Sequence, residues 1–175
     1  PPNVTPAIAR RWVRRSPVHE APVAARQPGL RVSAAANDMA QLILLPGKER
    51  SAIKHHPWVF AGAVGRLEGR ARPGDTVEVL ADNLRPLGRA AYSPHSQVRA
   101  RFWTFAPDES VDDAFIKRRI ATAVARREAL SELRGQQGLR LIHAESDGLP
   151  GIVADRYGDS GVIQLTSAGA VTWRQ

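Results

Sequence analysis

The sequence has no cysteine among its 175 residues. A disulfide framework, a cysteine nucleophile and a thiolate metal site are therefore excluded within these residues. Long apolar runs are missing as well, because no stretch approaches the ~20 residues that span a bilayer and none resembles the apolar core of a secretory signal. From these absences we expect a soluble, cytoplasmic protein with no membrane partner.

Lysine is scarce and arginine is abundant, with 3 Lys and 22 Arg contributing to a net charge of +8. A basic balance favours an anionic partner, and the planar guanidinium suits phosphate because it donates two hydrogen bonds at once. Nucleic acid is thus the leading partner. A second interpretation stays open, because an arginine bias also follows from a GC-rich genome and then requires no partner.

Residues 1–38 differ in composition from the rest of the chain. They contain six of the 13 prolines, six arginines and two acidic residues, and they sustain no period of 2 or 3.6. This composition predicts a disordered extension. The single methionine, Met39, stands where regular patterns begin. The extension is therefore expected to be either foreign to the natural protein, with Met39 as the natural start, or a basic tail that binds RNA.

Residues 39–106 have the pattern of a compact all-β domain. Apolar stretches bounded by turn residues predict strands at 41–45, 76–80, 87–92 and 98–105. A short helical turn is expected within 48–54. Pro57 favours the first turn of another helix, and we expect the large side chain of Trp58 in the core.

The strand predicted at 98–105 alternates, which places Arg99, Arg101 and Trp103 on one face. Two guanidiniums and an indole in one row are typical of a nucleic-acid surface, with arginine on phosphate and the indole on bases. A solvated edge strand with a half-buried tryptophan is the alternative. Charge and expected exposure give these RNA-binding candidates: Lys48, Arg50, Lys54, Arg66, Arg89, Arg99, Arg101 and Trp103.

Residues 107–175 predict one long helix followed by an antiparallel meander. Ser110 and Asp113 resemble a capping box, so the helix is expected to run over about 111–134 and to stop at Gly135. Strands are expected at 139–145, 151–156 and 161–166. Together the two parts predict the α+β class.

The stretch from Glu145 to Asp159 contains four carboxylates, three glycines and a proline. Glu145, Asp147 and Asp155 could act as the acid and base of a hydrolase. However, Asp147-Gly148 is a common turn signal, and no histidine, lysine or tyrosine is visibly placed beside these acids. A structural turn is the favoured interpretation. The histidines lack metal-ligand spacing and no phosphate-binding glycine loop is present, so we expect no catalytic site and no metal.

Several motifs, taken in order, resemble a known family. They are H-P-W-V-F-A-G-A-V at 56–64, A-Y-S-P at 91–94, R-A-R-F-W-T-F at 99–105, E-S-D-G-L-P-G at 145–151 and D-R-Y-G at 155–158. Over about residues 41–174 the sequence is similar to the N-terminal half of the ribosomal RNA large subunit methyltransferase I family. Members of that family are bacterial S-adenosylmethionine-dependent enzymes that methylate cytosine C5 in 23S rRNA.

The resemblance implies that residues 39–106 form a PUA domain, a small β pseudo-barrel that binds RNA. It implies that residues 107–175 form the β/α/β connecting domain of the family. Glu145, Asp147, Asp155 and Arg156 are then expected to face a further domain. The cofactor site and the attacking cysteine of the family belong to a C-terminal domain that is not matched here, so we expect no cofactor in this chain and no methyl transfer by it alone.

The prediction is therefore the RNA-binding part of a 23S rRNA cytosine-5 methyltransferase, with ribosomal RNA as its partner and a homodimer as an option for the full-length family. Two alternatives remain. One is a stand-alone PUA-type RNA adaptor, and the other is a carboxylate-dependent hydrolase.

Overall fold

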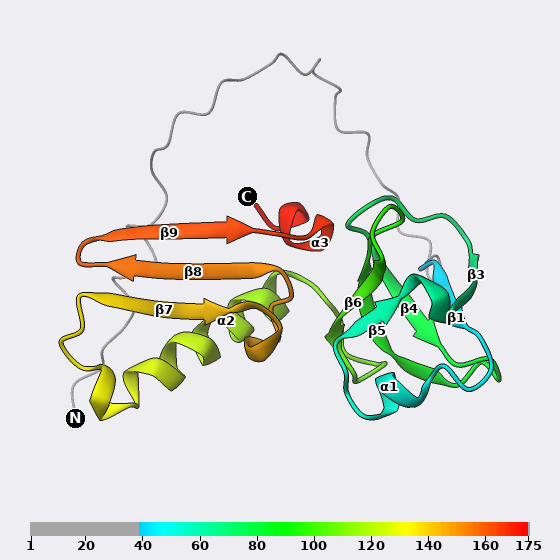
Figure 1. Cartoon of the computed structure of the whole chain (residues 1–175), viewed down its shortest axis with the longest axis horizontal. Coiled ribbons are helices and arrows are strands. Elements are labelled where there is room, and N and C mark those ends of the chain that lie inside the picture. Colours follow the sequence, from blue (N-terminus) through cyan, green and yellow to red (C-terminus); the bar gives the residue numbers. More distant parts are fainter. Residues whose placement is uncertain (1–38, 175) are drawn as a thin grey trace, which may run out of the picture. The chain divides into compact units, whose positions relative to one another are not determined.

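The computed structural model describes residues 39–174; the extension predicted at 1–38 lies outside the described residues. Residues 38–175 belong to one compact unit, which contains two sheets (Figure 1). Along the chain, a mostly antiparallel six-stranded sheet is followed by helix α2 (Asp113–Glu128) and then by a three-stranded antiparallel sheet. This confirms the α+β class, whereas the domain boundary near residue 106 stays a prediction.

The first sheet is six-stranded and has the order β2-β6-β5-β4-β1-β3. All neighbouring strands are antiparallel except β1 and β4, which are parallel. Its elements are β1 (Gln41–Leu44), α1 (Arg50–Ile53), β2 (Trp58–Phe60), a 3₁₀ turn (Ala61–Ala63), β3 (Val64–Glu68), β4 (Thr76–Leu80), β5 (Pro86–Tyr92) and β6 (Val98–Thr104).

Alternation of apolar residues builds the core of this sheet. In β4, Val77 and Val79 are fully buried while Thr76 and Glu78 are half-buried on the other face. The buried side chains of one face form a single core: Ala40, Leu42, Leu44, Ala52, Val59, Val77, Val79, Ala81, Leu87, Ala90, Ala100 and Phe102. Period-2 patterning therefore explains β4, β5 and β6, whereas β1 is a short apolar run with three successive buried residues; all four strands were predicted.

Two strands, β2 and β3, were not predicted. Strand β2 stands where a helix was expected to begin at Pro57. Residues 58–60 form β2, with Val59 buried and its two neighbours exposed. Tryptophan, valine and phenylalanine all favour strands, and in this segment that preference outweighs the tolerance of proline at a helix start. The expectation that Trp58 lies in the core is wrong, because its side chain stands on the opposite face from Val59.

The second sheet has the order β7-β8-β9 and is antiparallel throughout. Its elements are α2 (Asp113–Glu128), a 3₁₀ turn (Ser131–Leu133), β7 (Gly138–His143), a 3₁₀ turn (Ala144–Asp147), β8 (Ile152–Tyr157), β9 (Ser160–Leu165) and α3 (Ala168–Thr172). The three predicted strands are confirmed to within two residues at each end.

Helix α2 is shorter than predicted and is capped by a different residue. Asp112 is the N-cap, and its side chain accepts a hydrogen bond from the backbone N–H of Phe115 at 2.8 Å. This register buries Phe115 and Ile116, which form a core with Ala123, Ile142, Leu149 and Ile152. The helix ends before Gly135 because the backbone becomes extended at Leu130 and turns into the 3₁₀ segment.

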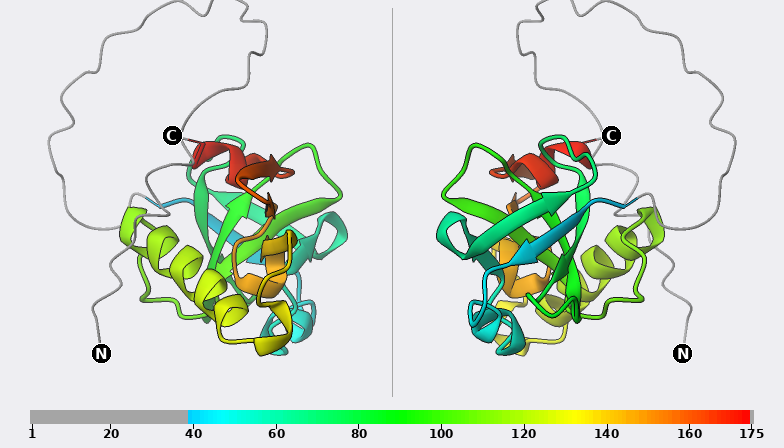
Figure 2. Two further views of the ribbon diagram at one scale, coloured as in Figure 1. Left: turned by 90° about the vertical axis from the view of Figure 1, so that its left-hand side faces the viewer. Right: turned by 90° about the vertical axis from the view of Figure 1, so that its right-hand side faces the viewer.

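Parts of the strands β5 and β6 are buried on both faces. Ala91 and Trp103 point away from the first core and join the second one, together with Ala170. Gly169 of α3 lies so close to Ala91 and Trp103 that a Cβ atom would collide with them. Figure 2 shows α3 against the strands of the first sheet. The second core thus reaches onto the first sheet.

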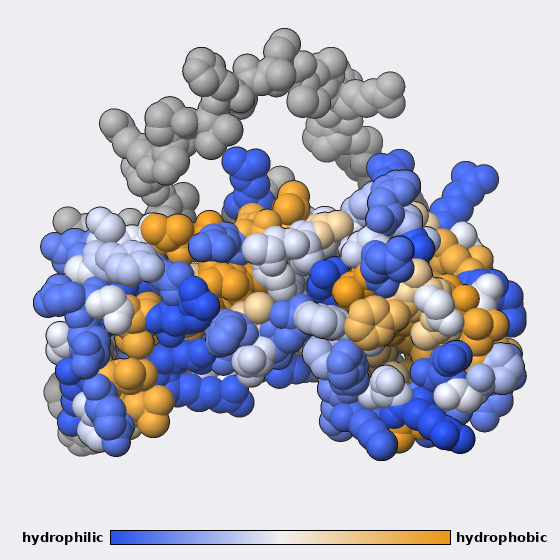
Figure 3. Space-filling model, viewed as in Figure 1, coloured by the Kyte–Doolittle hydropathy of each residue, from blue (hydrophilic) through white to orange (hydrophobic). Residues whose placement is uncertain are grey.

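Strand β9 forms an edge of the second sheet and leaves apolar side chains at the surface. Tyr157, Val162 and Ile163 are exposed, and apolar side chains appear over β8 and β9 in Figure 3. Within residues 39–174, no helix is long and apolar enough to cross a membrane.

Candidate nucleic-acid interface

The outer face of β2 and β6 combines aromatic rings with guanidinium groups. Trp58 pairs with Arg101 across the two strands, so their side chains share one face. Phe60 alternates with the core residue Val59, and Arg99 precedes the core residue Ala100 next to the register shift that pairs Phe60 with Val98. Trp58, Phe60, Arg99 and Arg101 are called the β2–β6 outer face below.

The aromatic side chains of this face are at the surface rather than in the core. Phe60 is 50% exposed and Trp58 is 38% exposed. Their rings meet edge to face at 6.1 Å, and the exposed His56 ring lies 5.9 Å from Trp58 and 6.2 Å from Phe60. Sequence reasoning missed this cluster. The signal was present in the W-V-F run, since strand alternation allows only one face of such a run to be buried.

The predicted cations lie at four places in the fold. Arg99 and Arg101 lie together, half-buried, on β6, while Lys48, Arg50 and Lys54 are exposed in and around α1, which lies beside β2. Arg66 lies on β3, at the other end of the strand order, and pairs with Glu68 at 2.8 Å. Arg89 is half-buried on β5, opposite Glu78 of β4.

Trp103 does not contribute to this surface. Its side chain is 2% exposed and packs at 6.5 Å, edge to face, on Trp173. Alternation does place it on the same strand face as Arg101, but at that end the face is covered by the second core. The predicted stacking of Trp103 on RNA is therefore wrong, because no base can reach a ring buried under α3.

Glu145 connects the ESDGLPG segment to the β2–β6 outer face. Its Oε1 accepts a hydrogen bond from Trp58 Nε1 at 2.8 Å and lies 3.6 Å from Arg101 Nε. The carboxylate fixes the indole orientation and partly neutralises Arg101. Glu145 therefore lies between the two sheets of the described unit; a contact with any further domain stays a prediction.

Asp147 stabilises the turn that follows β7. Arg127 of α2 donates to both of its carboxylate oxygens, at 2.6 and 2.7 Å, and the backbone N–H of His143 donates at 2.6 Å. Burial raises the pKa of Asp147, but these hydrogen bonds and the nearby arginine charges outweigh it, so the pKa lies below its usual value. Gly148 then takes a left-handed conformation, φ 66°.

Asp155 is paired within the second sheet. Arg140 of β7 donates to both oxygens, at 2.9 and 3.0 Å, and this bond lowers the pKa of Asp155. Both carboxylates are buried against arginines of their own part, and the expectation that Asp147 and Asp155 face a further domain stays a prediction. Arg156 is half-buried on β8, and its interdomain role stays a prediction.

These contacts oppose the hydrolase alternative. A general acid requires a raised pKa, whereas the pKa values of Asp147 and Asp155 are lowered. Glu145 is held by Trp58 and Arg101 instead of facing a second carboxylate. In the part of the chain that the structure describes, no group of three or more histidine, cysteine, aspartate or glutamate residues is arranged to hold a metal ion.

A family model described as "PUA-like domain" matches residues 42–105. Curated relatives named ribosomal RNA large subunit methyltransferase I, from Cronobacter sakazakii and Escherichia coli strain K12, are 50% and 51% identical over 130 residues. The match covers 74% of this chain and 33% of each relative. The chain therefore spans about a third of the length of these relatives.

Two solved structures share the fold. One, from Streptococcus mutans, is described as a SAM-dependent methyltransferase; it has a TM-score of 0.65 at 14% identity and covers 78% of this chain and 35% of that one. The other, a methyltransferase structure in complex with SAH, has a TM-score of 0.63 at 16% identity, with the same coverage. Over 74% of its length the chain is thus similar to one third of the relatives named ribosomal RNA large subunit methyltransferase I, and its residues 42–105 match a PUA-like domain.

Proposed function

We propose that this chain binds ribosomal RNA through the β2–β6 outer face and the basic segment around α1. The observation that carries the proposal is the adjacency of Trp58 and Arg101 on neighbouring strands, within a PUA-like domain of a chain related to rRNA methyltransferases. Guanidinium groups bind phosphates and exposed rings stack on bases. Both kinds of group therefore meet on one surface.

We assign no methyl-transfer chemistry to the described residues. The strand-to-helix junction between β9 and α3 is filled, because Gly169 packs directly on Ala91 and Trp103. A nucleotide-like cofactor requires open space at such a junction. The role proposed for this chain is to hold rRNA near a catalytic site supplied elsewhere in the protein. Cytoplasmic location and a homodimer stay predictions.

The proposal is tested by comparing two double variants that lose the same charge. Fluorescence anisotropy measures the affinity of the 175-residue chain for a labelled rRNA fragment at low salt. We expect Arg99→Ala with Arg101→Ala to weaken binding about tenfold or more, because two phosphate contacts of the surface are lost.

The matched control is Arg118→Ala with Arg126→Ala, which removes two arginines of α2 that are 55% and 64% exposed. It should weaken binding only slightly. If both double variants lost the same affinity, binding would depend on net charge alone and the proposed surface would be abandoned.

A further inference from the structure

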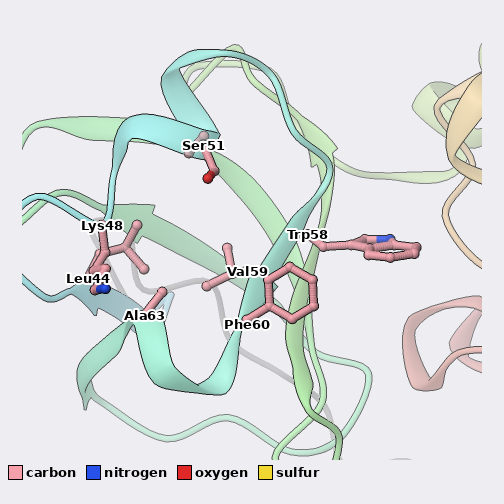
Figure 4. A pocket seen from close by; sticks show the side chains of 8 residues that line it. Leu44, Lys48, Ser51, Trp58, Val59, Phe60 and Ala63 are labelled. Carbon is pink, nitrogen blue, oxygen red and sulfur yellow. The ribbon is translucent and has the colours of Figure 1, made fainter.

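A small hollow lies between α1 and β2, beside the β2–β6 outer face. Its walls include Leu44, Lys48, Ser51, Ala63 and Phe60. Figure 4 shows Lys48, Ser51 and Phe60 around it, with Trp58 extending away from Lys48. The hollow is too small to enclose a ligand, so a ring held here would lie against the exposed face of Phe60 rather than inside the hollow.

The ring of Phe60 is exposed and does not fill the core. Val59, the next residue, fills the core at 4% exposure, whereas Phe60 is 50% exposed. Its neighbours on the open side are the rings of Trp58 and His56. Because Glu145 holds the indole of Trp58 by its N–H, this aromatic cluster has one fixed member. Phe60 therefore presents a supported ring face to solvent.

Positive charge surrounds the hollow. Segment 48–54 carries Lys48, Arg50 and Lys54 against one carboxylate, Glu49. All three cations are exposed, and Lys48 is itself part of the wall. Ser51 adds a hydroxyl that can donate or accept a hydrogen bond. An apolar peptide would gain nothing from these cations, whereas a base with its phosphate uses both the ring and the charge.

We propose that this hollow is a subsite for one unpaired RNA base, stacked on Phe60, with the adjoining phosphate on Lys48. The inference rests on the RNA binding proposed above and narrows its substrate class to single-stranded or looped RNA. A base inside a duplex has no free ring face, so a stacking subsite selects unpaired nucleotides. Stacking on one aromatic side chain is strong enough to be detected by substitution.

The test compares single-stranded oligoadenylate of about 12 nucleotides with an RNA duplex of the same length, using the 175-residue chain and fluorescence anisotropy. We expect Phe60→Ala to weaken single-strand binding about fivefold or more. Phe60→Leu, which keeps apolar area without a stacking face, should lose a similar amount. Phe60→Trp should keep the single-strand affinity of the unsubstituted chain. None of the three variants should change the affinity for the duplex.

A matched control is Leu130→Ala, because Leu130 is also 50% exposed but lies after α2; it should leave single-strand affinity unchanged. Circular dichroism verifies that the Phe60 variants fold. Equal losses on single strand and duplex, or no loss in Phe60→Ala, would overturn the subsite. If the unsubstituted chain bound no RNA at all, the proposed function would fail first, so the two failures are distinguishable.

Discussion

At the scale of single residues, Glu145 both orients Trp58 and offsets the charge of Arg101 on the β2–β6 outer face. One carboxylate oxygen holds the indole of Trp58 and lies 3.6 Å from Arg101 Nε. Arg101 is 18% exposed and Glu145 is 21% exposed, so the pair is partly shielded from salt. A phosphate that binds Arg101 has to compete with this carboxylate.

Glu145→Gln should therefore raise RNA affinity. The amide oxygen still accepts the bond from Trp58, but the negative charge beside Arg101 is lost. We expect an increase of about twofold, the size typical of a partly exposed ion pair. Anisotropy at low salt measures it, with Glu132→Gln, an exposed acid beyond α2, as the control. A loss of affinity in Glu145→Gln would show that the carboxylate is needed by the RNA itself.

Asp147 is a second residue with a measurable role, in stability. Its folded-state pKa is lowered, so its ion pair stabilises the fold above the unfolded pKa of about 3.9 and the stabilisation is lost as pH falls below that value. Asp147→Asn should lower the free energy of unfolding at pH 7 by about 3 kcal/mol. Urea unfolding measures this value.

The same comparison at about pH 3 should give a smaller difference, since below its pKa of about 3.9 the carboxyl of the unfolded chain is protonated and unfolding of the unsubstituted protein then takes up a proton. Asp159→Asn, at an exposed turn, should change neither value. A difference for Asp147→Asn that did not depend on pH would contradict the ion-pair explanation.

Residue roles were predictable from the sequence to different degrees. Arg99 and Arg101 could be paired on one face because alternation needs only the strand assignment. Phe60 and Trp58 were missed because the preceding proline favoured a helix start. Trp103 was misplaced for another reason: its face was right, but only the tertiary packing of α3 covers that face.

At the scale of elements, helix α2 has two candidate N-cap residues, Ser110 and Asp112. The sequence favoured Ser110, while the structure places Asp112 at the N-cap with its side chain bonded to the Phe115 backbone N–H. Asp112→Ala should lower the free energy of unfolding by about 1 kcal/mol, because one orphan donor of the first turn loses its acceptor. Thermal or urea unfolding measures the effect.

Ser110→Ala is the natural control, since Ser110 is exposed and precedes the helix; its effect should be within a few tenths of 1 kcal/mol. A larger loss of unfolding free energy in Ser110→Ala than in Asp112→Ala would show that Ser110 is the N-cap instead.

The strands of both sheets were predictable because period-2 patterns and turn residues are local signals. The ends of α2 were not, since both aspartate and serine make good caps and the stop at Leu130 depends on the 3₁₀ turn that follows. The turn after β7 was recognised from Asp147-Gly148, but its partner Arg127 lies 20 residues earlier in sequence and no local pattern links them.

At the scale of the whole molecule, the two sheets are coupled at two carboxylates. Glu145 contacts Trp58 and Arg101 of the first sheet, and Glu109 accepts from Thr104 of β6 and from Arg118 of α2, at 2.7 Å for the latter. The hydrogen bond from Thr104 contributes most to lowering the pKa of Glu109, with further lowering by Arg118 and Arg119. The proposed RNA surface on β2 and β6 is thus joined to the second part of the unit, at the 3₁₀ turn Ala144–Asp147 and at α2, by defined contacts.

The central claim is that the β2–β6 outer face binds RNA phosphates, and the salt dependence of RNA binding tests it most directly. The logarithm of the affinity of the 175-residue chain for single-stranded RNA should fall linearly with the logarithm of salt concentration. Each phosphate contact contributes a slope of about 0.7. Arg99→Ala with Arg101→Ala should reduce the slope by about 1.4. An unchanged slope in this double variant, or no salt dependence in the unsubstituted chain, would contradict the account.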